Sequence, residues 1–154
     1  MKSCNFRFLA ALAVSITVIM LFLSSSPLLT LGLDQADSVP LGTFITWAGM
    51  IAFPLMIYWS AKELRRPTNR WNSILANLLK IIIGLGILWV PIAYLLAGNI
   101  AFNFSNQPTF QGGQTAMRYF WRLSYGIPIG AILILVIFWI SSMLIKGDNN
   151  SHTS

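Results

Sequence analysis

Charged side chains are scarce in this chain. Only 9% of its 154 residues are charged, whereas about 25% is usual for a soluble domain. Hydrophobic residues make up 56%, and they lie in four long blocks instead of alternating with polar residues. Such blocks are typical of segments that cross a lipid bilayer. The shortage of charge therefore argues against a soluble globular domain and predicts an integral membrane protein.

Cysteine and histidine are almost missing. Cys4 is the only cysteine, so no disulfide can form within the chain, and His152, the only histidine, lies in a polar tail. The sequence thus contains no Cys/His cluster for zinc and no histidine inside an apolar block to hold a haem or a metal ion. We expect neither a metal ion nor a cofactor.

Acidic residues are missing from the interior of all four apolar blocks. Small proton-coupled transporters generally use such an acid, because ionisable groups within membranes are costly and serve function. The serines have no histidine or acid near them for a catalytic triad, and there are no paired carboxylates for acid–base chemistry. No glycine-rich phosphate-binding loop is present. These absences predict a protein that is not an enzyme.

The apolar blocks predict an all-α protein with four transmembrane helices, at about residues 8–31, 41–61, 74–97 and 124–145. At ~1.5 Å per residue each block can cross ~30 Å of hydrocarbon. Residues 1–146 would form one domain, and residues 147–154 a polar, disordered tail. The basic start of the chain also fits a cleaved signal peptide. Pro27, directly after three serines, disfavours cleavage, so we expect an uncleaved first span.

The ten lysines and arginines are unevenly divided between the two sides of this topology. Eight fall on one side: Lys2, Arg7, Lys62, Arg65, Arg66, Arg70, Lys80 and Lys146. Positive charge accumulates on the cytoplasmic side of membrane proteins. Both termini and the basic hinge are therefore expected in the cytoplasm, and short hairpins of this kind suggest a bacterial inner membrane.

Lys80 is the only ionisable residue predicted to lie inside a span, about two turns from the cytoplasmic end. Its long stem can carry the ammonium to the headgroups. Alternatively, Lys80 forms an ion pair with Glu63, the only acid in the cytoplasmic hinge, and fixes the second and third helices in register. A third possibility is a lysine that binds substrate.

A long outer connection, residues 98–123, becomes helical in pattern from Gln114 onward. Gln114, Arg118 and Arg122 recur every four residues and form a polar face, with apolar residues opposite. We expect a short amphipathic helix on the outer membrane surface, running into the fourth span. Its arginines would contact lipid phosphates or a partner; the candidate contacts are Gln114, Arg118, Trp121 and Arg122.

Small residues and prolines suggest how the helices pack. The pairs Ala48 with Ala52 and Gly126 with Gly130 have the four-residue spacing that permits close helix contact. Three prolines lie inside the predicted spans, and their kinks are either simply tolerated or open a cavity: Pro54, Pro91 and Pro128. The six tryptophans lie mostly near span ends, where such residues anchor a protein at the membrane interface.

The sequence carries no motif that names an activity. We expect a non-enzymatic membrane protein that binds another membrane component, as an accessory subunit, assembly factor or immunity-type protein. Its partners would be membrane lipids and a second membrane protein or another copy of itself, without nucleic acid. The four-span topology is similar to that of the immunity proteins against pore-forming colicins, although no motif is shared. The alternative is a small oligomeric transporter or channel.

Overall fold

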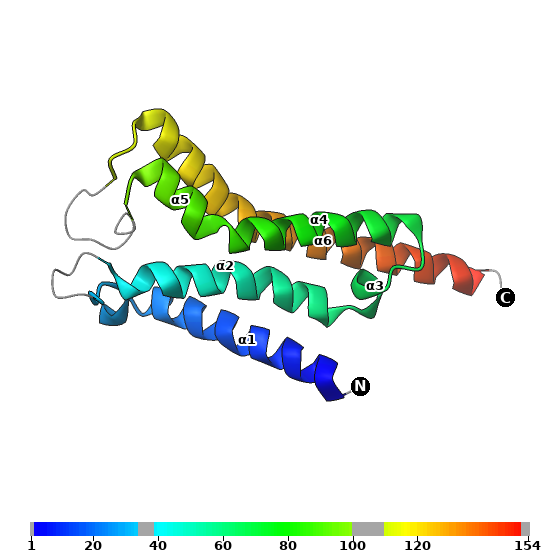
Figure 1. Ribbon diagram of the computed structural model, residues 1–154. Coiled ribbons are helices and arrows are strands. Elements are labelled where there is room, and N and C mark those ends of the chain that lie inside the picture. The colour runs from blue at the N-terminus through cyan, green and yellow to red at the C-terminus, as the bar shows by residue number, and fades with distance from the viewer. Residues whose placement is uncertain (1, 34–38, 100–109, 152–154) are drawn as a thin grey trace.

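Helices account for nearly all of the described chain. The computed structural model describes residues 2–33, 39–99 and 110–151 (Figure 1). Its elements are α1 (Lys2–Leu23), the 3-10 turn η1 (Pro27–Leu29), α2 (Leu41–Ser60), α3 (Lys62–Arg65), α4 (Arg70–Ile87), α5 (Trp89–Ala97) and α6 (Gln114–Ser151). Four helices are long and apolar enough to cross a membrane, as the apolar blocks predicted: Asn5–Leu23, Leu41–Ser60, Arg70–Ile87 and Gln114–Met143.

The helices are stacked in an order that leaves α1 at the edge. α1 packs along α2, and α2 packs on its other side against α4 and α6. In the part of the chain that the structure describes, α1 contacts only α2 and η1. The start of α1, the short α3 and the end of α6 lie at one end of the bundle, on the right in Figure 1. α2, α4 and α6 therefore form the packed unit, and α1 is attached to it through one neighbour.

The first helix ends earlier than the sequence suggested. It stops at Leu23, not near residue 31. Ser25 has a positive φ of 47°, which a helix cannot contain. The Ser26 hydroxyl then caps η1 by accepting a hydrogen bond from the Leu28 N–H, and Pro27 occupies its first position. The three serines thus form a turn, which the length of the apolar block did not predict.

The third predicted span is broken in two at Leu88, between α4 and α5. Pro91 has no N–H, so the Ile87 carbonyl loses its usual partner four residues on. The indole N–H of Trp47, from α2, donates to that carbonyl at 3.0 Å. The Ile87 carbonyl therefore keeps a hydrogen-bond partner at the break. The break also lets α5 run in a different direction from α4 (Figure 1).

The amphipathic segment that starts at Gln114 is not a separate helix. It forms the first turns of α6, which continues through Pro128 to Ser151. The polar residues that favoured a surface helix are equally compatible with an uninterrupted helix, and nothing between them and the fourth span breaks it. The predicted tail, residues 147–154, begins within α6, and its last three residues lie outside the described residues.

Two hydrophobic clusters hold α2, α4, α5 and α6 together. One lies toward the α3 end, and its buried members are Ile57, Leu64, Leu75, Leu79, Ala131, Ile134 and Phe138. The other lies where α5 meets α6 and contains Trp89, Ala93, Phe120 and Ile127. Within it, the Trp89 indole donates to the Ser124 hydroxyl at 2.9 Å. Trp89 is fully buried, so the expectation that it anchors the membrane surface is wrong.

α2 and α4 lie close together at Gly86. A Cβ added there would lie 2.5 Å from the Met50 carbonyl oxygen. Pro54 cannot donate a hydrogen bond back to Met50, so this carbonyl is one that the proline releases. The absence of a side chain at Gly86 lets the two backbones meet at the proline in α2, which fixes the middle of the bundle.

Candidate functional site

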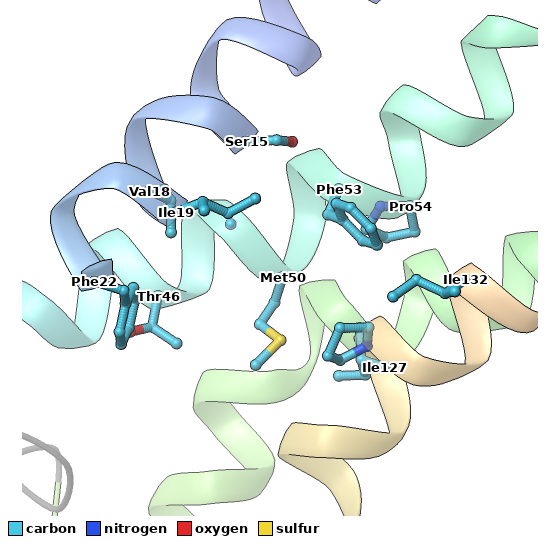
Figure 2. A pocket seen from close by; sticks show the side chains of 12 residues that line it. Ser15, Val18, Ile19, Phe22, Thr46, Met50, Phe53, Pro54, Ile127 and Ile132 are labelled. Atoms are coloured by element: carbon cyan, nitrogen blue, oxygen red, sulfur yellow. The ribbon is translucent and has the colours of Figure 1, made fainter.

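An apolar groove of about 410 Å³ is formed by α1, α2 and α6 (Figure 2). α2 supplies its floor, and α1 and α6 supply its two walls. The lining residues are Ser15, Val18, Ile19 and Phe22 from α1; Thr46, Gly49, Met50, Phe53 and Pro54 from α2; and Ile127, Pro128 and Ile132 from α6. Its volume falls in the range of small-molecule sites.

The groove exists because α1 and α6 pack on α2 without meeting each other. α1 lies close to α2 at Gly49, where an added Cβ would be 2.8 Å from Val18 Cγ1. On the far side, Ile127 is buried in the cluster that includes Trp89. Ile19 and Ile132, one on each wall, are 48% and 46% exposed. The groove is therefore rimmed by apolar side chains that still face the surroundings.

The two polar residues in the lining make hydrogen bonds within their own helices. The Ser15 hydroxyl donates to the Ala11 carbonyl at 2.8 Å, and the Thr46 hydroxyl donates to the Gly42 carbonyl at 2.7 Å. Each of these bonds occupies the one O–H donor of its hydroxyl, so only acceptor positions remain for a polar ligand. The groove thus presents methyl, methylene and aromatic groups, which suit an apolar occupant.

Pro54 on α2 and Pro128 on α6 both line this groove. They are two of the three prolines that the sequence analysis singled out. Both prolines therefore lie beside a cavity, in agreement with one of the two interpretations left open for them. The third, Pro91, instead lies at the break between α4 and α5 and does not line the groove. The sequence alone could not separate these roles, because they depend on which helix lies opposite each proline.

The predicted contact residues of α6 extend the wall of the groove toward the start of the helix. At 3.6 residues per turn, Gln114, Arg118 and Trp121 fall on the face that also carries Pro128 and Ile132. Tyr125 lies on the same face, and its ring stacks on Trp121 with centroids 5.4 Å apart and planes 16° apart. Arg118, Trp121 and Tyr125 are all exposed. Arg122, also exposed, lies beside this face, so the candidate contacts and the groove form one continuous surface.

The predicted pair of Glu63 and Lys80 is not brought together. Both side chains are exposed, and no ion pair joins them in the described part of the chain. The contact between α3 and α4 is made instead by Leu64, which is fully buried in the cluster that contains Leu75 and Leu79. Lys80 lies on an open face of α4: a Cβ added at Gly84, four residues on, would meet no described atom within 4 Å.

The four predicted packing residues have different surroundings. Gly130 lies against α4, because an added Cβ there would be 3.0 Å from Ile82 Cδ1. Ala52 is buried, whereas Ala48 is exposed. A Cβ added at Gly126 would meet no described atom within 4 Å. Gly49, where α1 lies close to α2, was not singled out from the sequence.

A second arrangement that sequence analysis missed joins α1 to the basic hinge. Two guanidinium groups lie over the Trp59 ring, with the Arg7 Cζ 5.1 Å and the Arg65 Cζ 5.5 Å from its centroid. Such cation–π contacts stabilise partly desolvated charges. Since Arg7 belongs to α1 and Arg65 to α3, this contact holds the start of α1 against the hinge that follows α2.

Comparison of the chain with protein-family models, curated proteins and solved structures gives no match. The interpretation of the groove therefore depends on its geometry and chemistry alone.

Proposed function

We propose that this chain is a non-enzymatic, multi-pass membrane protein that acts by binding another membrane component in the groove between α1, α2 and α6. The observation that carries the proposal is the groove itself, about 410 Å³ in volume and lined almost wholly by apolar groups. A groove of this kind, with exposed apolar walls, suits a ligand that is itself dissolved in the bilayer.

The chemistry of the lining favours binding over transport of a polar solute. A solute pathway needs polar groups that replace water around the solute. Here the hydroxyls of Ser15 and Thr46 are bonded to their own helices. An oligomeric transporter or channel would need polar surface from elsewhere, and it stays the alternative outcome of the experiment below.

The proposed setting is the bacterial inner membrane, with both termini in the cytoplasm. Two observations support this orientation. Arg7 and Arg65 contact the same tryptophan, so the basic start of the chain and the basic hinge lie at one end of the bundle. Arg118 and Arg122 lie in the first turns of α6, at the other end (Figure 1). The excess of positive charge at the first end supports its placement in the cytoplasm.

Affinity purification from mild detergent tests the proposal, with substitutions that fill the groove. Ile132→Trp enlarges a side chain on the groove wall. Leu133→Trp makes the same change one residue on, at a position that does not line the groove and is 54% exposed. We expect the wild-type protein and Leu133→Trp to retain the same membrane component, identified by mass spectrometry of proteins and lipids. Ile132→Trp should lose most of it.

Equal retention by all three proteins would overturn the proposal. If the purified chain alone instead moves solutes across proteoliposomes, the transporter interpretation replaces it.

A further inference from the structure

We propose that the component bound in the groove is a membrane glycerophospholipid, its acyl chains in the groove and its phosphate on Arg118 and Arg122. This inference rests on the function proposed above and narrows its ligand. It follows from the way the groove continues along α6 into an aromatic pair and then into two arginines.

The first step concerns the face of α6. Arg118, Tyr125 and Pro128 are separated by seven and three residues, spacings that return to one side of a helix. Pro128 lines the groove, whereas Arg118 lies outside it. All three residues lie within α6, which is one uninterrupted helix from Gln114 to Ser151. A molecule that follows this face passes directly from the groove to the arginine.

The second step concerns length. Arg118 precedes Pro128 by ten residues, which is about 15 Å along a helix. The hydrocarbon core of one leaflet is half of ~30 Å, also about 15 Å. A lipid phosphate at Arg118 would therefore place its acyl chains alongside Pro128 and the rest of the groove. A shorter amphiphile could not reach both sites, and a free phosphate would use only one of them.

The third step concerns the residues between the two sites. The stacked rings of Trp121 and Tyr125 lie between Arg118 and Pro128, and both are exposed. Amphipathic aromatic rings are enriched at the depth of lipid headgroups and glycerol backbones. Their place along α6 is thus where the headgroup of a bound lipid would join its chains.

The fourth step concerns charge. Arg118 and Arg122 are one helical turn apart, and both are exposed. The only acidic side chain that the structure describes, Glu63, lies on α3 at the opposite end of the bundle. Arginine binds phosphate through two parallel hydrogen bonds, a geometry that a partner helix of apolar residues does not offer. The charge at this end therefore favours a phosphate-bearing lipid over a partner's transmembrane helix as the occupant.

Native mass spectrometry of the full-length protein in detergent tests the inference with two probes. Dioleoyl phosphatidylglycerol carries the phosphate, and dioleoylglycerol has the same chains without it. We expect phosphatidylglycerol to bind with one-to-one stoichiometry and about ten-fold more tightly than dioleoylglycerol, since charge-assisted hydrogen bonds to phosphate are lost with the second probe.

Two pairs of variants separate the headgroup from the chains. R118Q/R122Q should lower phosphatidylglycerol affinity about ten-fold, to the level of dioleoylglycerol. The matched control, K62Q/R66Q, removes two exposed charges at the other end and should change nothing. Ile132→Trp should weaken both probes, and Leu133→Trp neither. Thermal unfolding and gel-filtration profiles confirm that each variant is folded.

Any of four results would overturn the inference. Equal affinity for the two probes would show that the phosphate does not contribute to binding. Equal losses in R118Q/R122Q and K62Q/R66Q would indicate general attraction to anionic lipid. Retention of a partner protein that depends on Ile132, without stoichiometric lipid, would leave the proposed function intact and assign the groove to a protein helix. If Ile132→Trp and Leu133→Trp behave as the wild type for proteins and lipids alike, the proposed function fails as well.

Discussion

α1 and α4 are both long enough to cross a membrane, yet they are held very differently. α1 is the more apolar helix, but only 6% of its candidate span is buried, against 28% for α4. α4 packs against α2 and α6, whereas α1 packs against α2 alone apart from η1. Lipid solvates apolar side chains as well as protein does, so hydrophobicity by itself gives no packing between membrane helices. What distinguishes α4 is its shape, above all Gly86, and its hydrogen-bonded neighbours.

The largest loss of stability is expected from Gly86→Ala, which acts on the contact between α4 and α2. The added methyl group would lie 2.5 Å from the Met50 carbonyl oxygen, and backbone atoms cannot easily move aside. We expect the free energy of unfolding to fall by about 2 kcal/mol. Gly84→Ala, two residues away with no described atom within 4 Å, is the matched control and should stay within about 0.5 kcal/mol. Unfolding in mixed micelles measures both; similar losses would contradict the close contact of α2 and α4.

A smaller loss is expected from Trp89→Phe. This change removes the indole N–H that donates to the buried Ser124 hydroxyl at 2.9 Å. We expect the free energy of unfolding to fall by about 1 kcal/mol, which is in the range measured for hydrogen bonds between membrane helices. A double-mutant cycle with Ser124→Ala isolates the bond. Trp139→Phe, at a position 65% exposed, controls for the change in ring size. Additive effects of Trp89→Phe and Ser124→Ala would show that the bond contributes nothing.

The hydrogen bond between the Trp47 indole and the Ile87 carbonyl also holds α4 in place, since it joins α2 to α4 at the proline break. Trp47→Phe should cost about 0.6 kcal/mol. In a Pro91→Ala background the cost should be smaller, because residue 91 regains an N–H that can serve the same carbonyl. The two measurements use the same unfolding assay. A cost that is unchanged in that background would mean that Pro91 does not create the need for Trp47.

Gly49→Ala should have the smallest effect on overall stability, within about 0.5 kcal/mol, because it disturbs only the contact of α1 with α2. The added Cβ would press on the Val18 side chain at 2.8 Å and loosen α1. Hydrogen exchange should therefore become faster in α1 and stay unchanged in α4. If exchange in α4 accelerates equally, α1 is part of the packed unit after all.

The sequence predicted the parts of this fold that depend on local composition. The four apolar blocks became four long helices, and the periodicity from Gln114 became the start of α6. The break at Leu88 was missed because a membrane helix tolerates Pro91 only where another helix satisfies the freed carbonyl, and Trp47 is forty residues away. Tertiary contacts of that kind leave no local pattern.

The candidate site, like the fold, was predicted only in part. Arg118 and Trp121 were identified, because charged and aromatic residues at helical spacing are visible in sequence. The groove beside them was not, since it arises where α1 and α6 fail to meet across α2. Gly49 was also overlooked in favour of residues spaced four apart. A single glycine reveals its role only when the neighbouring helix is known.

The break at Leu88 has a consequence for the membrane around the protein. It sends α5, and with it the first turns of α6, away from α1 and α2 (Figure 1). In a bilayer, the leaflet at this end would therefore surround segments that diverge from one another, and its lipids would have to pack between them.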